Sequence, residues 1–338
     1  MSIPKCLDKY QDIVLQDMHN FLDGSDLEHI KMVYYHLGWL DADLKPVKLS
    51  SGKLSRPSIL LLVNETLGGN VERALPAATA VQIFHDFTLM HDDIEDGDTL
   101  RRHRETAWKV WGVPRAINAG DAMYTLNFKS LLRLTDKRDE VLAYLLNVYG
   151  EIVAGQDMDL SFVSKNIENV SSDDYKRMIQ GKSAELIGAS AKVGAILAGS
   201  NGETQEKFYQ YGNELGLAYQ VFDDIVSFWG CKESSGKSEC RDVIERKKTL
   251  PILMGFELSE EKDSARLTNI YKQREISVDD VAEVLAILAK YKVKEACLAK
   301  LEEHKNLASL AVENLGLENS SKQDFIDIID WLIPGEVS

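Results

Sequence analysis

Two acidic segments at the ends of apolar runs are the residues best suited to chemistry. The first is HDDIED at residues 91–96, which follows the apolar run from Val81 to Met90. On a helix at about 100° per residue, Asp92, Asp93 and Asp96 project from one arc of roughly 100°. Three carboxylates so close repel one another unless a cation neutralises them. Hard oxygen ligands that keep some water and share a phosphate suit Mg²⁺, so this segment predicts a magnesium site directed at a phosphate.

The second acidic segment repeats this pattern downstream. Gln220, Asp223 and Asp224 end the apolar run from Leu215 to Phe222. Two acidic patches that face each other would clamp a diphosphate through shared Mg²⁺ ions. A single acidic helix end is often only a solvated surface. Two acidic helix ends that each follow an apolar helical run favour a functional site. A carboxylate di-iron bundle is excluded, because it uses Glu-x-x-His pairs and no histidine here has a glutamate three residues before it.

Basic residues near the first acidic segment could bind the phosphates. A glycine-started loop at residues 97–104 carries Arg101, Arg102 and Arg104. Guanidinium groups match phosphate oxygens with paired hydrogen bonds, although a run of charges can also be an ordinary solvated face. Lys53 and Arg56 lie in a loop that opens a helix and could reach an anion there, with surface exposure as the alternative.

Two further residues stand on predicted apolar helices. Lys182 falls within a helix rich in alanine and glycine, so it must be paired or lie at a cavity. His85 lies two turns before Asp93 on roughly the same side of its helix. A lone histidine on an apolar face is more often a satisfied core residue, so both interpretations of His85 stay open.

The elements that position these residues read as helices throughout. Prolines number only seven, strand-like alternation is rare, and apolar spacings of three and four recur, which predicts an all-α protein in a single domain over residues 1–338. The predicted helices are 8–22, 27–40, 74–93, 116–134, 138–160, 173–199 and 204–229, with several more between 249 and 335. Residues 161–172 are predicted to be a polar loop. Residues 231–246 have the composition of a mobile flap. Lys237, Lys247 and Lys248 could close on a diphosphate there, with ordinary surface lysines as an equal alternative.

Composition excludes several other classes of protein. The net charge of −15 over 338 residues argues against nucleic acid or an anionic membrane as a partner. The four cysteines show no Cys-x-x-Cys spacing and fit free thiols in a reducing cytosol. No signal peptide, membrane anchor or transmembrane run is visible, so we expect a cytoplasmic protein.

Taken in order, these motifs resemble those of the trans-isoprenyl diphosphate synthases, or polyprenyl synthetases, over residues 45–255. The matching residues are GKLSRP at 52–57, His85 with HDDIED at 91–96, Arg101-Arg102, Gly120-Asp121, Gly155-Gln156, Lys182-Ser183, Gln220 with Asp223-Asp224, Lys237, Asp242, and KKTLP at 247–251. The fold implied is a bundle of mostly antiparallel helices around one deep cavity, usually in a homodimer.

The resemblance also implies a role for each matching residue. Asp92, Asp93, Asp96 and Asp223 would hold three Mg²⁺ ions on an allylic diphosphate, and Asp224 joins them as a candidate ligand. The same diphosphate would be contacted by Arg101, Lys182, Lys237 and Lys247. Isopentenyl diphosphate would be bound by Lys53, Arg56, His85 and Arg102. The developing allylic cation would face Gln220 and Ser183.

Several positions depart from the family pattern. Leu54 stands where arginine is usual, Gln82 where glutamate is common, and His103 and Glu105 replace a glycine and a proline. Ser227 replaces the last aspartate of the second acidic motif, which leaves fewer protein ligands for one metal ion. The resemblance therefore predicts the fold more strongly than the reaction.

The depth of the cavity is expected to set the product length. Phe87 lies five residues before Asp92, about 7.5 Å deeper along the helix, with the small Thr88 one position nearer and Phe84 nearly a turn deeper. In the family, an aromatic residue at this depth implies a product near C20. The sequence near Trp229 resembles a bacterial subgroup often assigned as geranylgeranyl diphosphate synthases. We therefore expect geranylgeranyl diphosphate, made from farnesyl diphosphate or a shorter primer, unless Phe87 is a core residue that faces away.

Two other functions remain open from the sequence. A terpene cyclase or another prenyltransferase on the same scaffold would fit Ser227 and the altered arginine loop. A catalytically silent subunit that regulates a partner synthase is the second alternative. The intact Asp92, Asp93, Asp96 and Asp223 argue against a silent subunit.

Overall fold

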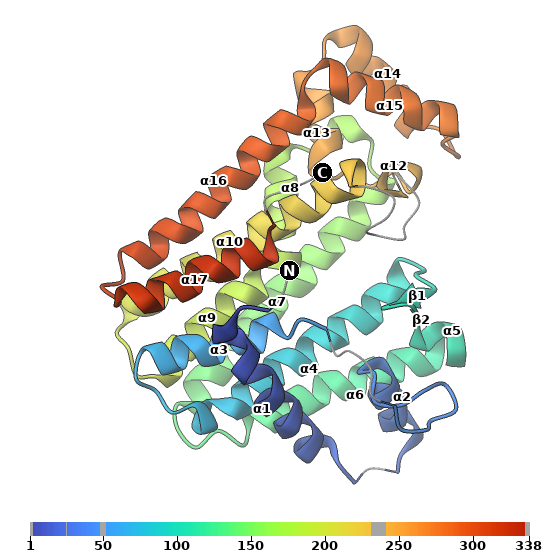
Figure 1. The fold of residues 1–338 in the computed structure, drawn as a ribbon. Helices are drawn as coiled ribbons and strands as arrows, with labels where there is room; N and C mark the ends of the chain where they lie inside the picture. Colours follow the sequence, from blue (N-terminus) through green and yellow to red (C-terminus); the bar gives the residue numbers. More distant parts are fainter. Residues whose placement is uncertain (1–2, 25, 48–51, 231–240, 335–338) are drawn as a thin grey trace. The chain divides into compact units, whose positions relative to one another are not determined.

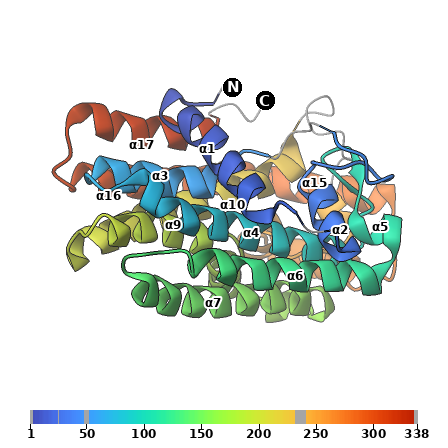
Figure 2. The same ribbon diagram turned by 90° about the horizontal axis from the view of Figure 1, so that it is seen from below.

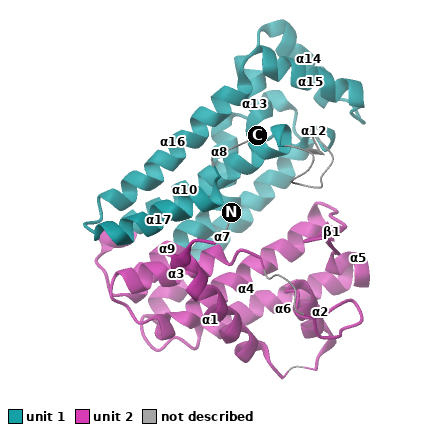
Figure 3. Cartoon of the chain, in the orientation of Figure 1, with its two compact units in different colours: residues 1–2, 147–189, 207–338 teal, residues 3–146, 190–206 magenta. Residues whose placement is uncertain are grey.

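The computed structural model describes residues 3–24, 26–47, 52–230 and 241–334, and its regular structure is almost entirely helical. Within these residues the strands are β1 (Leu100–Arg101) and β2 (Arg104–Glu105), which pair as one antiparallel hairpin (Figure 1). The all-α prediction is confirmed. Contacts divide the chain into two compact units, each built from separate stretches of sequence (Figure 3). Unit 1 comprises residues 1–2, 147–189 and 207–338, and unit 2 comprises residues 3–146 and 190–206.

Unit 2 contains the first acidic segment. Its helices are α1 (Lys5–Leu22), α2 (Glu28–His36), α3 (Ser55–Thr66), α4 (Val71–Glu95), α5 (Ala107–Trp111) and α6 (Val113–Leu131), with the start of α7 (Arg138–Ser164), the end of α9 (Glu185–Leu197) and the start of α10 (Gly202–Trp229). α4 packs along α6 and α3, and α1 packs on α3 and α4, an arrangement visible in Figures 1 and 2.

Small residues explain the close packing of α4 on α6. Ala77 and Ala80 of α4 and Ala116 and Ala119 of α6 are fully buried, so the two backbones can approach closely. A Cβ atom at Gly120 of α6 would clash with the imidazole of His91. The glycine of the Gly-Asp motif therefore keeps α6 close to the acidic end of α4.

Unit 1 contains the second acidic segment. Its elements are the rest of α7, a 3₁₀ turn (Ile167–Asn169), α8 (Ser172–Ile179), a π-helical turn (Gln180–Ala184), the start of α9, the rest of α10, α12 (Arg241–Ile244), α13 (Leu250–Leu258), α14 (Glu261–Tyr271), α15 (Val278–Lys290), α16 (Val293–Glu313) and α17 (Asn319–Leu332). Ser171 with Asp174 forms a capping box at the start of α8, and Ser277 with Asp280 forms another at the start of α15.

Two predicted boundaries and one predicted continuous helix differ most from the structure. The helix predicted over 27–40 ends at His36, because Gly38 adopts a φ of +82° that a helix does not tolerate. α7 extends to Ser164, into the segment 161–172 that was predicted to be a loop. The helix predicted over 173–199 is interrupted by the π-helical turn at residues 180–184, where the chain passes very close to α7.

Membrane and disulfide features can be assessed over the described ranges. Within them, no helix has both the length and the hydropathy needed to cross a bilayer. Cys6 and Cys297 are not joined in a disulfide, while Cys231 and Cys240 lie outside the described residues. The prediction of a single domain stays a prediction.

Candidate active site

The first acidic segment closes α4. Asp96 is the C-cap, and its backbone nitrogen donates to the carbonyl of Asp92 at 2.8 Å. Asp93 is buried, whereas Asp92 and Asp96 are partly exposed. Carboxylates at a helix C-terminus also meet the negative end of the helix dipole, which adds to their mutual repulsion. A cation is therefore needed at this helix end.

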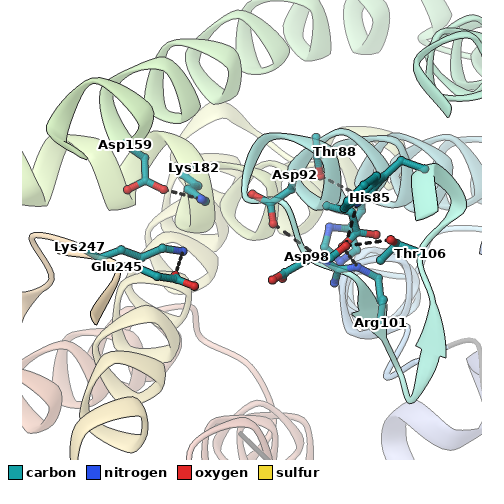
Figure 4. Close-up of polar contacts among 12 residues, drawn as sticks. His85, Thr88, Asp92, Asp98, Arg101, Thr106, Asp159, Lys182, Glu245 and Lys247 are labelled. Carbon is teal, nitrogen blue, oxygen red and sulfur yellow. Dashed lines mark hydrogen bonds and ion pairs between the residues drawn. The ribbon is translucent and has the colours of Figure 1, made fainter. Parts of the chain in front are cut away.

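Arg101 supplies part of that positive charge. Its Nε donates to Asp93 Oδ1 at 2.7 Å, and its Nη2 lies 3.7 Å from Asp92 Oδ2 (Figure 4). Burial raises the pKa of Asp93 to about 6, while the Arg101 guanidinium opposes that rise. The predicted proximity of Arg101 to the acidic segment is thus observed.

The carboxylates of α4 fit a divalent cation that arrives with a phosphate. Asp93 Oδ2 is buried without a hydrogen-bond partner, so it retains a coordination position. Over the described ranges, no three His, Cys, Asp or Glu side chains are already grouped to hold a metal. Mg²⁺ commonly uses one or two carboxylates together with water and substrate phosphates, so a preformed cage is not required.

A basic cluster occupies the same unit. Arg56 Nη1 lies 3.2 Å from His85 Nε2. A guanidinium can only donate, so His85 Nε2 accepts and the imidazole carries its proton on Nδ1. Burial, reinforced by the charges of Arg56 and Arg102, holds the pKa of His85 well below its usual value. His85 is therefore a neutral, oriented partner of Arg56.

Arg102 lies between a loop and a buried carboxylate. Its Nη2 is 3.8 Å from Asp86 Oδ1, and a Cβ atom at Gly52 would lie 2.8 Å from that same nitrogen. Gly52 also has a φ of +85°, so both space and backbone conformation favour glycine there. The neighbouring Lys53 is exposed. Leu54, where the family usually has arginine, is buried with a φ of +47°.

In unit 1, the two aspartates of the second segment have opposite environments. Asp223 is exposed, and Asp224 is only 4% exposed. Asp224 Oδ2 accepts from Tyr175 Oη at 2.6 Å and from the backbone nitrogen of Leu250 at 3.1 Å. Burial raises the pKa of Asp224 to about 7. Together with a hydrogen bond from Gln220, the Asp224 carboxyl group accepts three hydrogen bonds.

Gln220 links Asp224 to Ser183. Its Nε2 donates to Asp224 Oδ1 at 2.9 Å, and its Oε1 accepts from Ser183 Oγ at 2.6 Å. The two bonds fix the amide orientation, with the oxygen on the side of Ser183. Tyr175 is the member of this network that the sequence analysis missed.

Lys182 is paired, which is one of the two arrangements expected for a lysine in an apolar helix. Its Nζ donates to Asp159 Oδ2 at 2.5 Å (Figure 4). Lys182 lies in the π-helical turn, a feature frequent at functional sites. A Cβ atom at Gly155 would overlap the backbone nitrogen of Lys182, so the Gly-Gln motif of α7 permits this close crossing. Asp159 was not predicted.

The lysines after α12 differ from one another. Lys247 Nζ lies 3.8 Å from Glu245 Oε2, and both side chains are partly exposed (Figure 4). Lys248 is buried and donates to the carbonyl of Val163 at 3.0 Å, and burial lowers its pKa to about 8. Lys248 therefore packs into unit 1. Lys237 lies outside the described residues.

Ser227 has a carboxylate partner of its own. Its hydroxyl donates to Asp242 Oδ2 at 2.5 Å. An aspartate at position 227 would instead set two negative charges against each other. Serine in place of the last aspartate of the second motif therefore allows a hydrogen bond between α10 and α12.

Aromatic side chains gather on the acidic half of α4. The Phe87 ring lies 5.5 Å from Phe84, 4.7 Å from His91 and 5.2 Å from Tyr124 of α6. Phe84 is buried and Phe87 only partly so. The Thr88 hydroxyl bonds back to the carbonyl of His85 at 2.7 Å. Tyr124 was not predicted, although its place one turn after Gly120 offered a signal.

Comparison with known proteins agrees with this arrangement. A profile of the polyprenyl synthetase family matches residues 38–288. A (2E,6E)-farnesyl diphosphate synthase of Mycobacterium tuberculosis is 37% identical over 242 residues, covering 71% of this chain and 67% of that protein. A geranylgeranyl diphosphate synthase of the same organism is 36% identical over 274 residues, covering 80% and 77%. A polyprenyl synthetase structure from Streptomyces coelicolor A3(2) superposes with a TM-score of 0.89 at 28% identity, covering 98% of this chain and 100% of that one.

The helical architecture and the charged helix ends define an all-α protein of the isoprenoid synthase type. The chain belongs to the polyprenyl synthetase family, and it is a trans-prenyltransferase.

Proposed function

We propose that this protein condenses isopentenyl diphosphate with an allylic prenyl diphosphate, preferably farnesyl diphosphate, to give an all-trans product near C20. The observation that carries the proposal is the grouping of Arg56, His85, Arg101 and Arg102 in the same unit as the partly exposed Asp92 and Asp96. Guanidinium groups can bind the oxygens of a diphosphate, and the carboxylates in the same unit can bind the divalent cations that accompany it.

Isopentenyl diphosphate would be bound by Lys53, Arg56 and Arg102. Guanidinium groups donate to phosphate oxygens in pairs, and His85 stays neutral while it orients Arg56. Gly52 leaves room beside the Arg102 guanidinium. The subsite thus combines fixed positive charge with a glycine that keeps the backbone clear of the ligand.

The allylic diphosphate would be held through Asp92, Asp93, Asp96 and Asp223. Bound Mg²⁺, proposed at three ions per active site, would neutralise the leaving diphosphate. Arg101, Lys182 and Lys247 would donate to the same group, and Lys237 is proposed to join them. Asp224 is better suited to positioning Gln220 than to ligating a metal, because its oxygens accept three protein hydrogen bonds.

The reaction would break the allylic C–O bond and form a new C–C bond from the double bond of isopentenyl diphosphate. A proton is then lost, and the released diphosphate is the proposed base. Gln220 Oε1 is a fixed dipole, oriented by Asp224 and shared with Ser183, that can stabilise the developing cation. No protein nucleophile is required.

Product length is proposed to be limited by Phe87, with Phe84 and Tyr124 supporting its ring. The similar proteins include both farnesyl and geranylgeranyl diphosphate synthases, so the C20 length of the product rests on Phe87 and not on these names.

We further propose a cytoplasmic homodimer. Val113, Ile117 and Tyr124 lie on one face of α6 with exposures of 39, 39 and 36%, and this apolar face suits a second copy of the chain.

An incubation with Mg²⁺, farnesyl diphosphate and labelled isopentenyl diphosphate tests the reaction, with product sizing after phosphatase treatment. A labelled C20 alcohol supports the proposal. A hydrocarbon or cyclic alcohol formed from farnesyl diphosphate alone would replace it with a terpene cyclase. Diphosphate binding without either product would favour a silent subunit.

A further inference from the structure

The hairpin that carries Arg101 and Arg102 has an unusual turn. Arg101 pairs with Arg104, so Arg102 and His103 form a two-residue loop. Their φ values are +51° and +63°, as a type I′ turn requires. Neither residue is glycine, and side chains with a Cβ atom rarely adopt this conformation. The surroundings must therefore hold the turn in place.

Arg104 holds the second strand from one side. Its Nη1 donates to the carbonyl of Tyr35 at 3.1 Å, and its Nη2 donates to the carbonyl of Leu40 at 2.7 Å. The guanidinium carbon also lies 4.1 Å from the centroid of the Tyr35 ring. Tyr35 belongs to the last turn of α2, where a cation is favoured by the helix dipole.

Tyr35 holds the same strand from the other side. Its hydroxyl donates to the carbonyl of Glu105 at 2.7 Å, and its ring packs edge-on against Trp111 at 4.8 Å. The end of α2 and β2 are thus joined by side chains in both directions. This set of contacts, from Arg104 to the carbonyls of Tyr35 and Leu40 and from Tyr35 to Glu105, is named here the α2 clamp.

The base of the hairpin is fixed separately. The carbonyl of Asp98 accepts from Thr106 Oγ1 at 2.8 Å (Figure 4). It also accepts from Trp108 Nε1 at 2.8 Å. Arg101 is held by Asp93 of α4. Arg102 has a longer contact, 3.8 Å to Asp86, so the α2 clamp affects it more than Arg101.

We propose that Arg104 is a positioning residue that, with Tyr35, sets the Arg102–His103 turn so that the Arg102 guanidinium is placed for the diphosphate of isopentenyl diphosphate. The inference rests on the proposed function, since Arg102 is assigned there to that substrate. Arg104 itself faces the backbone of the 35–40 segment and does not need to touch substrate.

Arg104→Lys is the sharpest test, because it keeps the charge and removes the fork that reaches two carbonyls. We expect KM for isopentenyl diphosphate to rise about tenfold, with KM for the allylic diphosphate nearly unchanged. Tyr35→Phe, which loses only the bond to Glu105, should raise the same KM by a smaller factor. Arg115→Lys is the matched control, because Arg115 pairs with Glu28 of the same helix α2 through an exposed contact of 2.6 Å.

A background variant tests the role of the turn. In His103→Gly protein, Arg104→Lys should raise KM less, since glycine adopts positive φ without a side-chain clash. An equal effect in both backgrounds would overturn the link between the clamp and the strained turn. A lowered melting temperature with unchanged KM, or equal rises in both KM values, would reduce Arg104 to a structural role. Wild-type protein that elongates no primer would overturn the proposed function and this inference with it.

Discussion

The hydroxyl of Tyr175 on α8 donates to the buried carboxyl of Asp224 on α10 at 2.6 Å. This contact places an acidic residue of the second motif inside unit 1, with Gln220 bonded to its other oxygen. The nearby Asp223 is exposed. The two adjacent aspartates thus have different environments. Asp223 is exposed to solvent, whereas Asp224 is buried and orients Gln220.

Tyr175→Phe should therefore lower both stability and turnover. It leaves one hydrogen bond fewer on a buried carboxyl group, a cost of about 1–3 kcal/mol in the free energy of unfolding. It also loosens Asp224, and with it the Gln220 amide, so kcat should fall. Urea unfolding and steady-state rates measure the two effects.

A second tyrosine–carboxyl pair separates these effects. Tyr209 Oη donates to Glu185 Oε2 at 2.6 Å, and Glu185 is only 9% exposed. Tyr209→Phe should lower stability with little change in kcat. Equal kcat values for the two variants would contradict a positioning role for Tyr175.

The raised pKa of the buried Asp86 carboxyl group predicts that the free energy of unfolding depends on pH. Burial raises its pKa to about 6, opposed chiefly by Arg102 and the Gln82 hydrogen bond. A raised folded-state pKa means that the folded state holds the proton more tightly than the unfolded chain. Stability from this group is therefore present below the ordinary pKa of 3.8 and is lost as pH rises through 6.

Asp86→Asn should remove that loss. Its stability relative to wild type should rise between about pH 4 and pH 6, by on the order of 3 kcal/mol, and then level off. Urea unfolding over this range measures the difference, and the lowest pH serves as the internal reference because the side chain at position 86 is neutral in both folded proteins there. A difference that stays constant with pH would show that Asp86 ionises normally.

Phe87→Ala should lengthen the product. The Phe87 ring fills space among Phe84, His91 and Tyr124, and its removal opens room for further C5 units. Sizing of the dephosphorylated products would then show alcohols longer than C20. Phe21→Ala, which truncates another partly buried ring of unit 2, should leave the product unchanged. An unchanged product with Phe87→Ala would exclude Phe87 as the floor.

The sequence was sufficient for features that depend on local pattern. Apolar periodicity predicted the helices, and the position of Arg101 just after the first acidic segment predicted its contact with that segment, which it makes through Asp93. Partners far apart in sequence were missed. Tyr175 lies 49 residues from Asp224, and Tyr35 lies 69 residues from Arg104. Such pairs depend on how helices are packed and in which register, and neither is encoded in local propensity.

The π-helical turn at Lys182 was missed for a related reason. Gly181 lies in the turn, but Gly188 and Gly194 stand within the regular helix that follows, so a glycine alone did not mark the interruption. The turn coincides with the crossing of two glycines, where a Cβ atom at Gly155 would lie 2.7 Å from the backbone carbon of Gly181. The crossing sets the local backbone from which Lys182 reaches Asp159.

Gly155→Ala tests this crossing, and α7 offers its own control. The added methyl group would overlap the backbone of the π-helical turn, so the helices must separate or the turn must change, and both stability and kcat should fall. Gly150 lies on the same helix with nothing within 4 Å of its would-be Cβ atom. Gly150→Ala should instead stabilise the protein by about 0.5–1 kcal/mol, because alanine is the better helix former. If both variants behaved alike, the effect would reflect helix propensity, and the close approach of α7 to Lys182 would not be required for activity.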